Sequence, residues 1–254
     1  YAARLTSIGP YRIFGFYSVP TGPGPFPGLL YTPRYGSVNN PAHLDDRERY
    51  AVLVLMHRGQ RLADQPYAAA YPGLLTDGIA DPATYIYRGI VADCVRGLEF
   101  LRDRPEVITE RIGVVGDDLA LITAARRPEV RVAQLNGTMF YRLPEARRLT
   151  DAYPIEEVND YLRANPDAEA AVTRTLAYFD PVHHAPAITA TTQIPLGQGT
   201  ISDQAWMQPL IDAIAGPTDT YTLTNKGGID HDAREAWLAG LMDVPPRPRL
   251  WAVS

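Results

Sequence analysis

Short apolar runs alternate with helical patterns along most of the 254-residue chain. The apolar runs lie at 10–20, 29–33, 51–56, 112–115, 131–135, 191–197 and 219–223. Those at 29–33 and 51–56 lack polar alternation, which is typical of strands buried on both faces. Residues 86–103 repeat apolar side chains on one helical face, at Ile86, Ile90, Cys94, Leu98 and Leu101. Strands that alternate with helices predict an α/β fold with a mostly parallel sheet and crossover helices.

The stretches between the predicted strands differ in character. Residues 34–49 are polar and are predicted as a loop. Residues 137–180 carry helical patterns between two core strands, so they are predicted as an insertion that caps a site. The chain shows no repeats and no low-complexity segment, and residues 1–254 are therefore predicted to form a single domain.

Composition narrows the range of partners. Apolar residues make up 46% and charged residues 21%, as expected of a globular protein with a core. The net charge of −5 and the lack of a basic stripe argue against nucleic acid. No apolar run approaches the roughly 20 residues of a membrane span, so no membrane partner is expected. The lone Cys94 excludes an internal disulfide and suits a reducing compartment, which predicts a cytoplasmic protein. The spacing of His57, His183 and His184 matches no ligand motif, so no metal or other cofactor is expected.

Residues 112–126 (IGVVGDDLALITAAR) have the pattern of a strand, a sharp turn and a helix. This is the form of a nucleophile elbow, in which G-x-S-x-G places a serine above a sheet. Gly116 and Ala120 occupy the two positions that have no room for large side chains, and Asp118 stands where the serine belongs. The pattern predicts Asp118 on a tight turn at the carboxyl edge of the sheet.

Several longer stretches resemble the acetyl xylan esterase / cephalosporin-C deacetylase family of α/β-hydrolases. They are YPGLLTDGIADPATYIYRGIVADCVRGLEFL (71–101), RGQ (58–60), ERIGVVG (110–116) and TRTLAYFDPVHHA (173–185). The resemblance extends from about Tyr11 to Met242. It implies an α/β-hydrolase core with helices on both faces, a Ser-Asp-His triad, deacetylation of small esters and often a hexamer. A homo-oligomer is therefore expected.

The chain departs from the family's pattern in its chemistry. Asp118 replaces the serine, and Leu119 replaces the glutamine whose backbone amide helps to form the oxyanion hole. Near the position of the family's triad aspartate the chain reads GQGTISD, so the acid is either lost or replaced by Asp203. The family's tyrosine-containing oxyanion loop corresponds to YTPRYGS, where either Tyr31 or Tyr35 matches.

The family's Gly-His-Glu ending reads IDHD here, so His231 matches its histidine. His231 is predicted on a loop after the last strand, where a histidine serves as general base near neutral pH. The neighbouring Asp230 either orients it or starts the closing helix. Asp117 lies beside Asp118, and the two charges either raise one pKa or diverge into solvent.

Three functions remain open from these residues. In the first, Asp118 and His231 act as acid and base on a small organic substrate, such as a specialised metabolite, in an isomerase, epimerase, lyase or cyclase. In the second, Asp118 is a nucleophile toward an epoxide or halide carbon, with an ester intermediate. In the third, the chain is a non-catalytic binding or scaffold protein, and Asp118 is a residue at a helix N-terminus. A conventional serine deacetylase is not expected.

Overall fold

The computed structural model describes residues 1–254 except 10, 37–38, 61, 64–70 and 249–254. Eight strands form one sheet in the order β1-β2-β4-β3-β5-β6-β7-β8. Their bounds are β1 Ala2–Thr6, β2 Arg12–Ser18, β3 Phe26–Tyr31, β4 Ala51–Met56, β5 Val107–Gly116, β6 Val130–Leu135, β7 Thr191–Leu196 and β8 Thr218–Thr222. β1 and β2 pair antiparallel, and every pairing from β4 to β8 is parallel. The predicted mostly parallel α/β sheet is confirmed.

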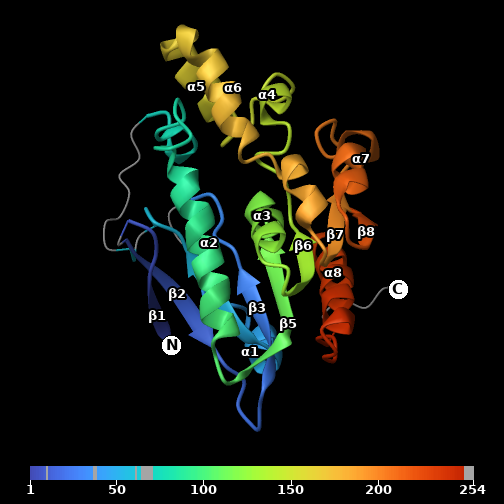
Figure 1. Cartoon of the computed structure of the whole chain (residues 1–254). Coiled ribbons are helices and arrows are strands. Elements are labelled where there is room, and N and C mark those ends of the chain that lie inside the picture. Colours follow the sequence, from blue (N-terminus) through green and yellow to red (C-terminus); the bar gives the residue numbers. More distant parts are fainter. Residues whose placement is uncertain (10, 37–38, 61, 64–70, 249–254) are drawn as a thin grey trace.

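Helices cover both faces of the sheet (Figure 1). Their bounds are α1 Leu44–Arg49, α2 Ile86–Arg102, α3 Asp118–Arg126, α4 Leu143–Ala146, α5 Glu156–Ala164, α6 Glu169–Ala177, α7 Gln204–Ala213 and α8 Gly227–Leu241. The larger apolar core contains side chains of α2, α3 and α7, whereas a smaller one joins Tyr50, next to α1, and Leu238 of α8 to the opposite face. Short 3-10 turns include η1, Leu74–Thr76.

The insertion between β6 and β7 contains α4, α5 and α6, which extend beyond the end of the sheet where β5 leads into α3 (Figure 1). This agrees with the helical cap predicted for residues 137–180. No helix within the described part of the chain is long and apolar enough to cross a membrane.

The polar stretch 34–49 was expected to be a loop, but it contains α1. The helix has no buried residue, so it lacks the apolar periodicity that predicts a helix. Its charges explain its formation: Asp45 and Asp46 lie in the first turn and Arg47 and Arg49 in the last, which complements the helix dipole.

Candidate functional site at the carboxyl edge of the sheet

Four parallel strands, β4, β3, β5 and β6, end side by side and bring polar side chains to one edge. Arg34 and Tyr35 follow β3, His57 follows β4, Asp118 follows β5, and Asn136 follows β6. In open α/β sheets, ligands bind outside the carboxyl ends of the strands. This edge is therefore the candidate site.

Asp118 lies in the helix that follows β5 rather than on a strained turn. Asp117 is the N-cap residue, with φ −82° and ψ −156°, and Asp118 is the first residue of α3. The turn from β5 to α3 is tight, because only Asp117 separates them, but Asp118 lacks a positive φ, which among the described residues other than glycine occurs only at Arg142, Asn225 and Asp243. Gly116 is required by close packing, because a Cβ there would collide with the Thr32 side chain.

The Asp118 carboxyl is held inside the fold. Only 1% of the residue is exposed. Its Oδ2 accepts backbone N–H groups from Met139 and, at 2.9 Å, from Phe140. Its Oδ1 is buried and has no hydrogen-bond partner among the described residues. Burial raises the pKa of Asp118 to about 7, although the two backbone hydrogen bonds oppose the shift. The carboxyl therefore exchanges its proton near neutral pH.

Asp118 and His57 both line a small chamber of about 10 Å³. The remaining wall residues are Pro33, Arg34, Tyr35, Tyr87, Asp117, Leu119, Met139 and Phe140. His57 is 2% exposed, and its Nε2 is also without a hydrogen-bond partner in the described structure. Burial lowers the pKa of His57 to about 4, so its ring is neutral at pH 7.

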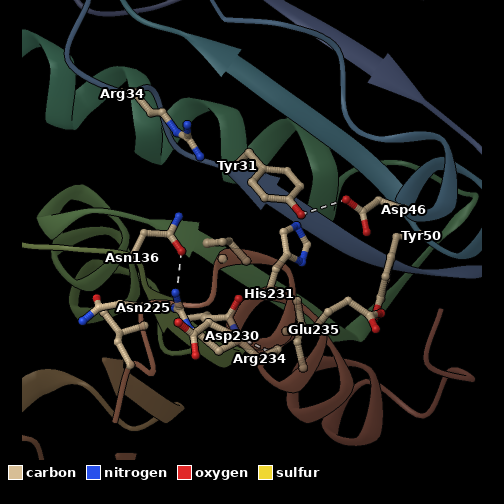
Figure 2. A pocket seen from close by; sticks show the side chains of 15 residues that line it. Tyr31, Arg34, Asp46, Tyr50, Asn136, Asn225, Asp230, His231, Arg234 and Glu235 are labelled. Atoms are coloured by element: carbon tan, nitrogen blue, oxygen red, sulfur yellow. Dashed lines mark hydrogen bonds between the residues drawn. The ribbon is translucent and has the colours of Figure 1, made fainter. Parts of the chain in front are cut away.

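His231 lies in α8 rather than on the loop that the sequence predicted. The helix begins at Gly227, so His231 is in its second turn and its side chain is exposed. It lines a cleft of about 440 Å³ between α1 and α8, shown in Figure 2. Prominent polar side chains of this cleft are Tyr31, Arg34, Asp46, Tyr50, Asn136, Asn225, Asp230, Arg234 and Glu235. His231 therefore faces a ligand-sized space.

Asp118 and His231 are directed into different spaces. Asp118 lines the chamber and His231 lines the cleft, and no hydrogen bond between them occurs in the described structure. Arg34 lines both spaces, so they adjoin at this residue. The Asp118 side chain turns toward residues 139 and 140 because their backbone N–H groups satisfy its Oδ2.

The predicted triad acids have other partners. Asp203 caps α7, because its Oδ1 accepts the N–H of Trp206 at 2.8 Å. Asp230 accepts the Tyr221 hydroxyl at 2.9 Å and both the N–H and the hydroxyl of Thr224. Neither aspartate forms a hydrogen bond with His231 in the described structure.

The remaining predicted residues surround the chamber and the cleft. Asp117 is half-buried; burial raises the pKa of its carboxyl, and Arg34 opposes that shift. Leu119 is buried in the larger core, although it also forms part of the chamber wall. Tyr31 donates its hydroxyl to Asp46 at 3.0 Å (Figure 2).

Tyr35 donates its hydroxyl to Glu157 of α5, which also accepts the N–H of Leu75. Tyr35 lines the chamber and a further part of the cleft that contains His231. This tyrosine therefore connects the cap to the site.

Sequence reasoning considered His57 only as a metal ligand and did not single out Arg34 or Asn136. Each of them follows the last residue of a buried parallel strand within three positions, and that placement was the available signal. The described residues contain no group of His, Cys, Asp and Glu that could hold a metal ion.

A mostly parallel sheet with helices on both faces and a site at its carboxyl edge is the arrangement of an α/β-hydrolase, and solved structures of that class superpose on the chain. Acetyl xylan esterase from Paenibacillus sp. R4 superposes with a TM-score of 0.82 at 25% identity, over 94% of this chain and 83% of that chain. Acetyl Xylan Esterase 1 from Thermoanaerobacterium sp. JW/SL YS485 gives a TM-score of 0.79 at 20% identity, over 95% and 83%.

The model of the acetyl xylan esterase (AXE1) family matches residues 1–205, and the chain belongs to this family. The resemblance inferred from the sequence is thus confirmed. Among curated proteins, acetyl esterase Axe7A of Xylanibacter ruminicola is 23% identical over 252 residues. That match covers 89% of this chain but 51% of the relative, so the chain spans about half the length of this relative.

Proposed function

We propose that this member of the acetyl xylan esterase family binds a small polyhydroxylated ligand in the cleft and does not cleave esters through a serine. The proposal is supported mainly by the position and hydrogen bonds of Asp118. The residue at the expected nucleophile position is a carboxylate inside α3, with one oxygen bonded to two backbone amides. It lines a different cavity from His231, and no hydrogen bond joins the two in the described structure, which argues against a nucleophile–base pair.

The hydroxyl groups around the cleft do not replace the serine. Among the described lining residues, hydroxyls belong to Tyr31, Thr32, Tyr35 and Tyr50. Thr32 donates to the Val115 carbonyl, and Tyr31 and Tyr35 donate to carboxylates. These acceptors are not His231, which would have to accept the proton of an attacking hydroxyl, and the Tyr50 hydroxyl is buried without a hydrogen-bond partner among the described residues.

The cleft instead mixes hydrogen-bond donors with acceptors. Arg34 and Asn136 offer donors on one side, and the carboxylates of Asp46 and Glu235 offer acceptors beyond His231 (Figure 2). A hydroxyl group both donates and accepts, so a ligand with several hydroxyls matches this lining. The solved relatives are named for xylan, a polymer of such sugars, which supports a carbohydrate ligand.

We expect p-nitrophenyl acetate to be hydrolysed at the background rate, because the described residues that line the cleft include no serine or cysteine. A fluorophosphonate probe should likewise leave the protein unlabelled. The esterase from Paenibacillus sp. R4 serves as the positive control in both assays. Saturable hydrolysis with covalent labelling of this chain would reject the proposal.

We expect xylobiose or xylotriose to bind in isothermal titration calorimetry. Arg34→Ala and Asn136→Ala should each weaken binding about tenfold, since each removes a hydrogen-bond donor from the cleft. Arg88→Ala is the matched control, because Arg88 is an exposed arginine of α2 that lies outside the cleft. Equal affinities in all four proteins would place the ligand elsewhere, and no heat of binding would refute a carbohydrate ligand.

General acid–base catalysis by Asp118 is the second candidate function. It is favoured by the unpartnered Oδ1 and by the pKa of about 7, which suits proton transfer at neutral pH. Such catalysis would exchange substrate hydrogen with deuterated solvent, and Asp118→Asn would stop the exchange. Nucleophilic attack by Asp118 would instead leave ¹⁸O in its carboxyl after turnover in labelled water. The narrow chamber favours proton transfer over attack on a carbon atom.

A further inference from the structure

The chamber behind the cleft contains two orphaned polar atoms on residues that are almost fully buried. Asp118 Oδ1 and His57 Nε2 lack hydrogen-bond partners among the described residues, and both residues line the chamber. A buried polar atom without a hydrogen-bond partner destabilises the folded state. Two such atoms at one small space indicate a site that is completed by something from outside the chain.

The neighbouring contacts fix which atom accepts a hydrogen bond. His57 Nδ1 contacts the backbone carbonyl of Arg58, which can only accept, so Nδ1 carries the ring proton. Nε2 of the neutral ring is therefore an acceptor. Asp118 Oδ2 already accepts two N–H groups, so the proton of the neutral carboxyl resides on Oδ1, which then donates. Two residues of the chamber wall thus have one unused donor and one unused acceptor between them.

The space matches a single hydroxyl group. Its volume of about 10 Å³ is at the lower limit for one water-sized group. A hydroxyl accepts one hydrogen bond and donates another, which satisfies both orphaned atoms at once. An acetylated hydroxyl lacks the proton that His57 requires and is too large for the space.

We propose that the chamber is a subsite that takes one free hydroxyl of the ligand in the cleft and excludes its acetyl ester. This inference rests on the proposed carbohydrate-binding function. Arg34 and Tyr35 line both the chamber and the neighbouring cleft, so a ligand there reaches the subsite between them. The chain would accordingly select the deacetylated form of a sugar.

The first experiment compares xylobiose with fully acetylated xylobiose by calorimetry. The parent protein should prefer xylobiose by at least tenfold. His57→Ala removes the acceptor and enlarges the chamber, so this preference should fall to less than threefold. His183→Ala is the matched control, because His183 is exposed and lies outside the chamber. An unchanged preference in His57→Ala would overturn the subsite.

A second experiment measures how the affinity depends on the protonation of Asp118. It does not require the His57→Ala variant to fold. The charged and titratable groups around Asp118 are Asp117, Asp180, Tyr35, Tyr87, His57 and Arg34. Above pH 7 the Asp118 carboxyl loses its proton and can no longer donate a hydrogen bond. The affinity of the parent for xylobiose should therefore fall about three- to tenfold between pH 6 and pH 8.5. In Asp118→Asn the amide supplies a donor at every pH, and the affinity should stay constant over this range.

The exposed Asp167→Asn is the control and should retain the pH dependence of the parent. A parent affinity that does not change with pH would overturn the subsite. The outcomes also separate the two proposals. If neither sugar binds to any protein, the carbohydrate-binding function fails. If both sugars bind equally well to the parent, that function stands and the subsite alone is wrong.

Discussion

At the scale of single residues, Asp118 combines a structural contact with an unsatisfied oxygen. Its Oδ2 accepts hydrogen bonds from residues 139 and 140, whereas Oδ1 is buried and has no hydrogen-bond partner among the described residues. The folded-state pKa of about 7 exceeds the ordinary value of 3.8, mainly because of burial. Between these pH values the folded chain holds a proton that the unfolded chain has released. The contribution of Asp118 to stability is therefore greatest below pH 4 and is lost as the pH rises through 7.

We expect Asp118→Asn to stabilise the protein at pH 8 and to have little effect at pH 4. The amide mimics the neutral carboxyl, because its oxygen can accept the same two N–H groups. The gain in the free energy of unfolding at pH 8 could reach about 4 kcal/mol, the upper limit set by the pKa difference. Urea unfolding at both pH values measures it, with the exposed Asp167→Asn as control. A gain that is equal at pH 4 and pH 8 would show that Asp118 is not the titrating group.

At the scale of elements, the positions at which helices begin determine the roles of Asp203 and His231. Asp203 was a candidate for the triad acid, but it begins α7 as the N-cap residue. A cap satisfies one of the N–H groups that the first turn leaves free. The position of His231 also differs from the predicted loop, because α8 begins four residues before it and therefore includes it.

We expect Asp203→Ala to lower the free energy of unfolding by about 1 kcal/mol through loss of the cap. Asp203→Asn should retain most of the stability, since asparagine is an equally good N-cap. Neither variant should alter the affinity for xylobiose. Thermal unfolding and calorimetry provide the two measurements, and a loss of binding without a loss of stability would return Asp203 to the site.

At the scale of the whole molecule, one buried ion pair joins three segments that are far apart in the sequence. Arg58, after β4, donates through Nη2 to Asp93 of α2 at 2.7 Å and contacts the Ser7 hydroxyl and the Ile8 carbonyl after β1. Gly89 leaves the room for this guanidinium, because a Cβ there would meet Arg58. The RGQ sequence thus begins with a structural arginine.

We expect Asp93→Ala to lower the free energy of unfolding by about 3–5 kcal/mol, because it leaves the Arg58 charge without its buried partner. The exposed Asp103→Ala is the control and should change stability by less than about 0.5 kcal/mol. Urea unfolding checks both values. A small effect at Asp93 would mean that water solvates Arg58.

Homo-oligomerisation, which followed from the family resemblance, and the cytoplasmic location, which followed from the lone cysteine, stay predictions. Light scattering coupled to gel filtration would test the first. The small-molecule partner also stays a prediction, which is supported by the cleft and by the ligand proposed for it.

The sequence by itself determined the fold class and the edge where the site lies. The run 51–56 and the helical pattern 86–103 became β4 and α2, because the periodicity of apolar residues reflects which faces are buried. The family's sequence stretches predicted the same core. Even Asp118 was placed correctly after β5, since position along a strand–helix connection is a local property.

Only the tertiary structure decided where the side chains of the site point. Asp118 accepts hydrogen bonds from residues 139 and 140, and His57, which follows β4, lines the same chamber. The orientation of each side chain depends on contacts between residues that are distant in the sequence. The burial that sets the pKa of Asp118 comes from the same packing. The local pattern of apolar and polar residues does not indicate these long-range contacts. For that reason the sequence paired Asp118 with His231, whereas the fold places it beside His57.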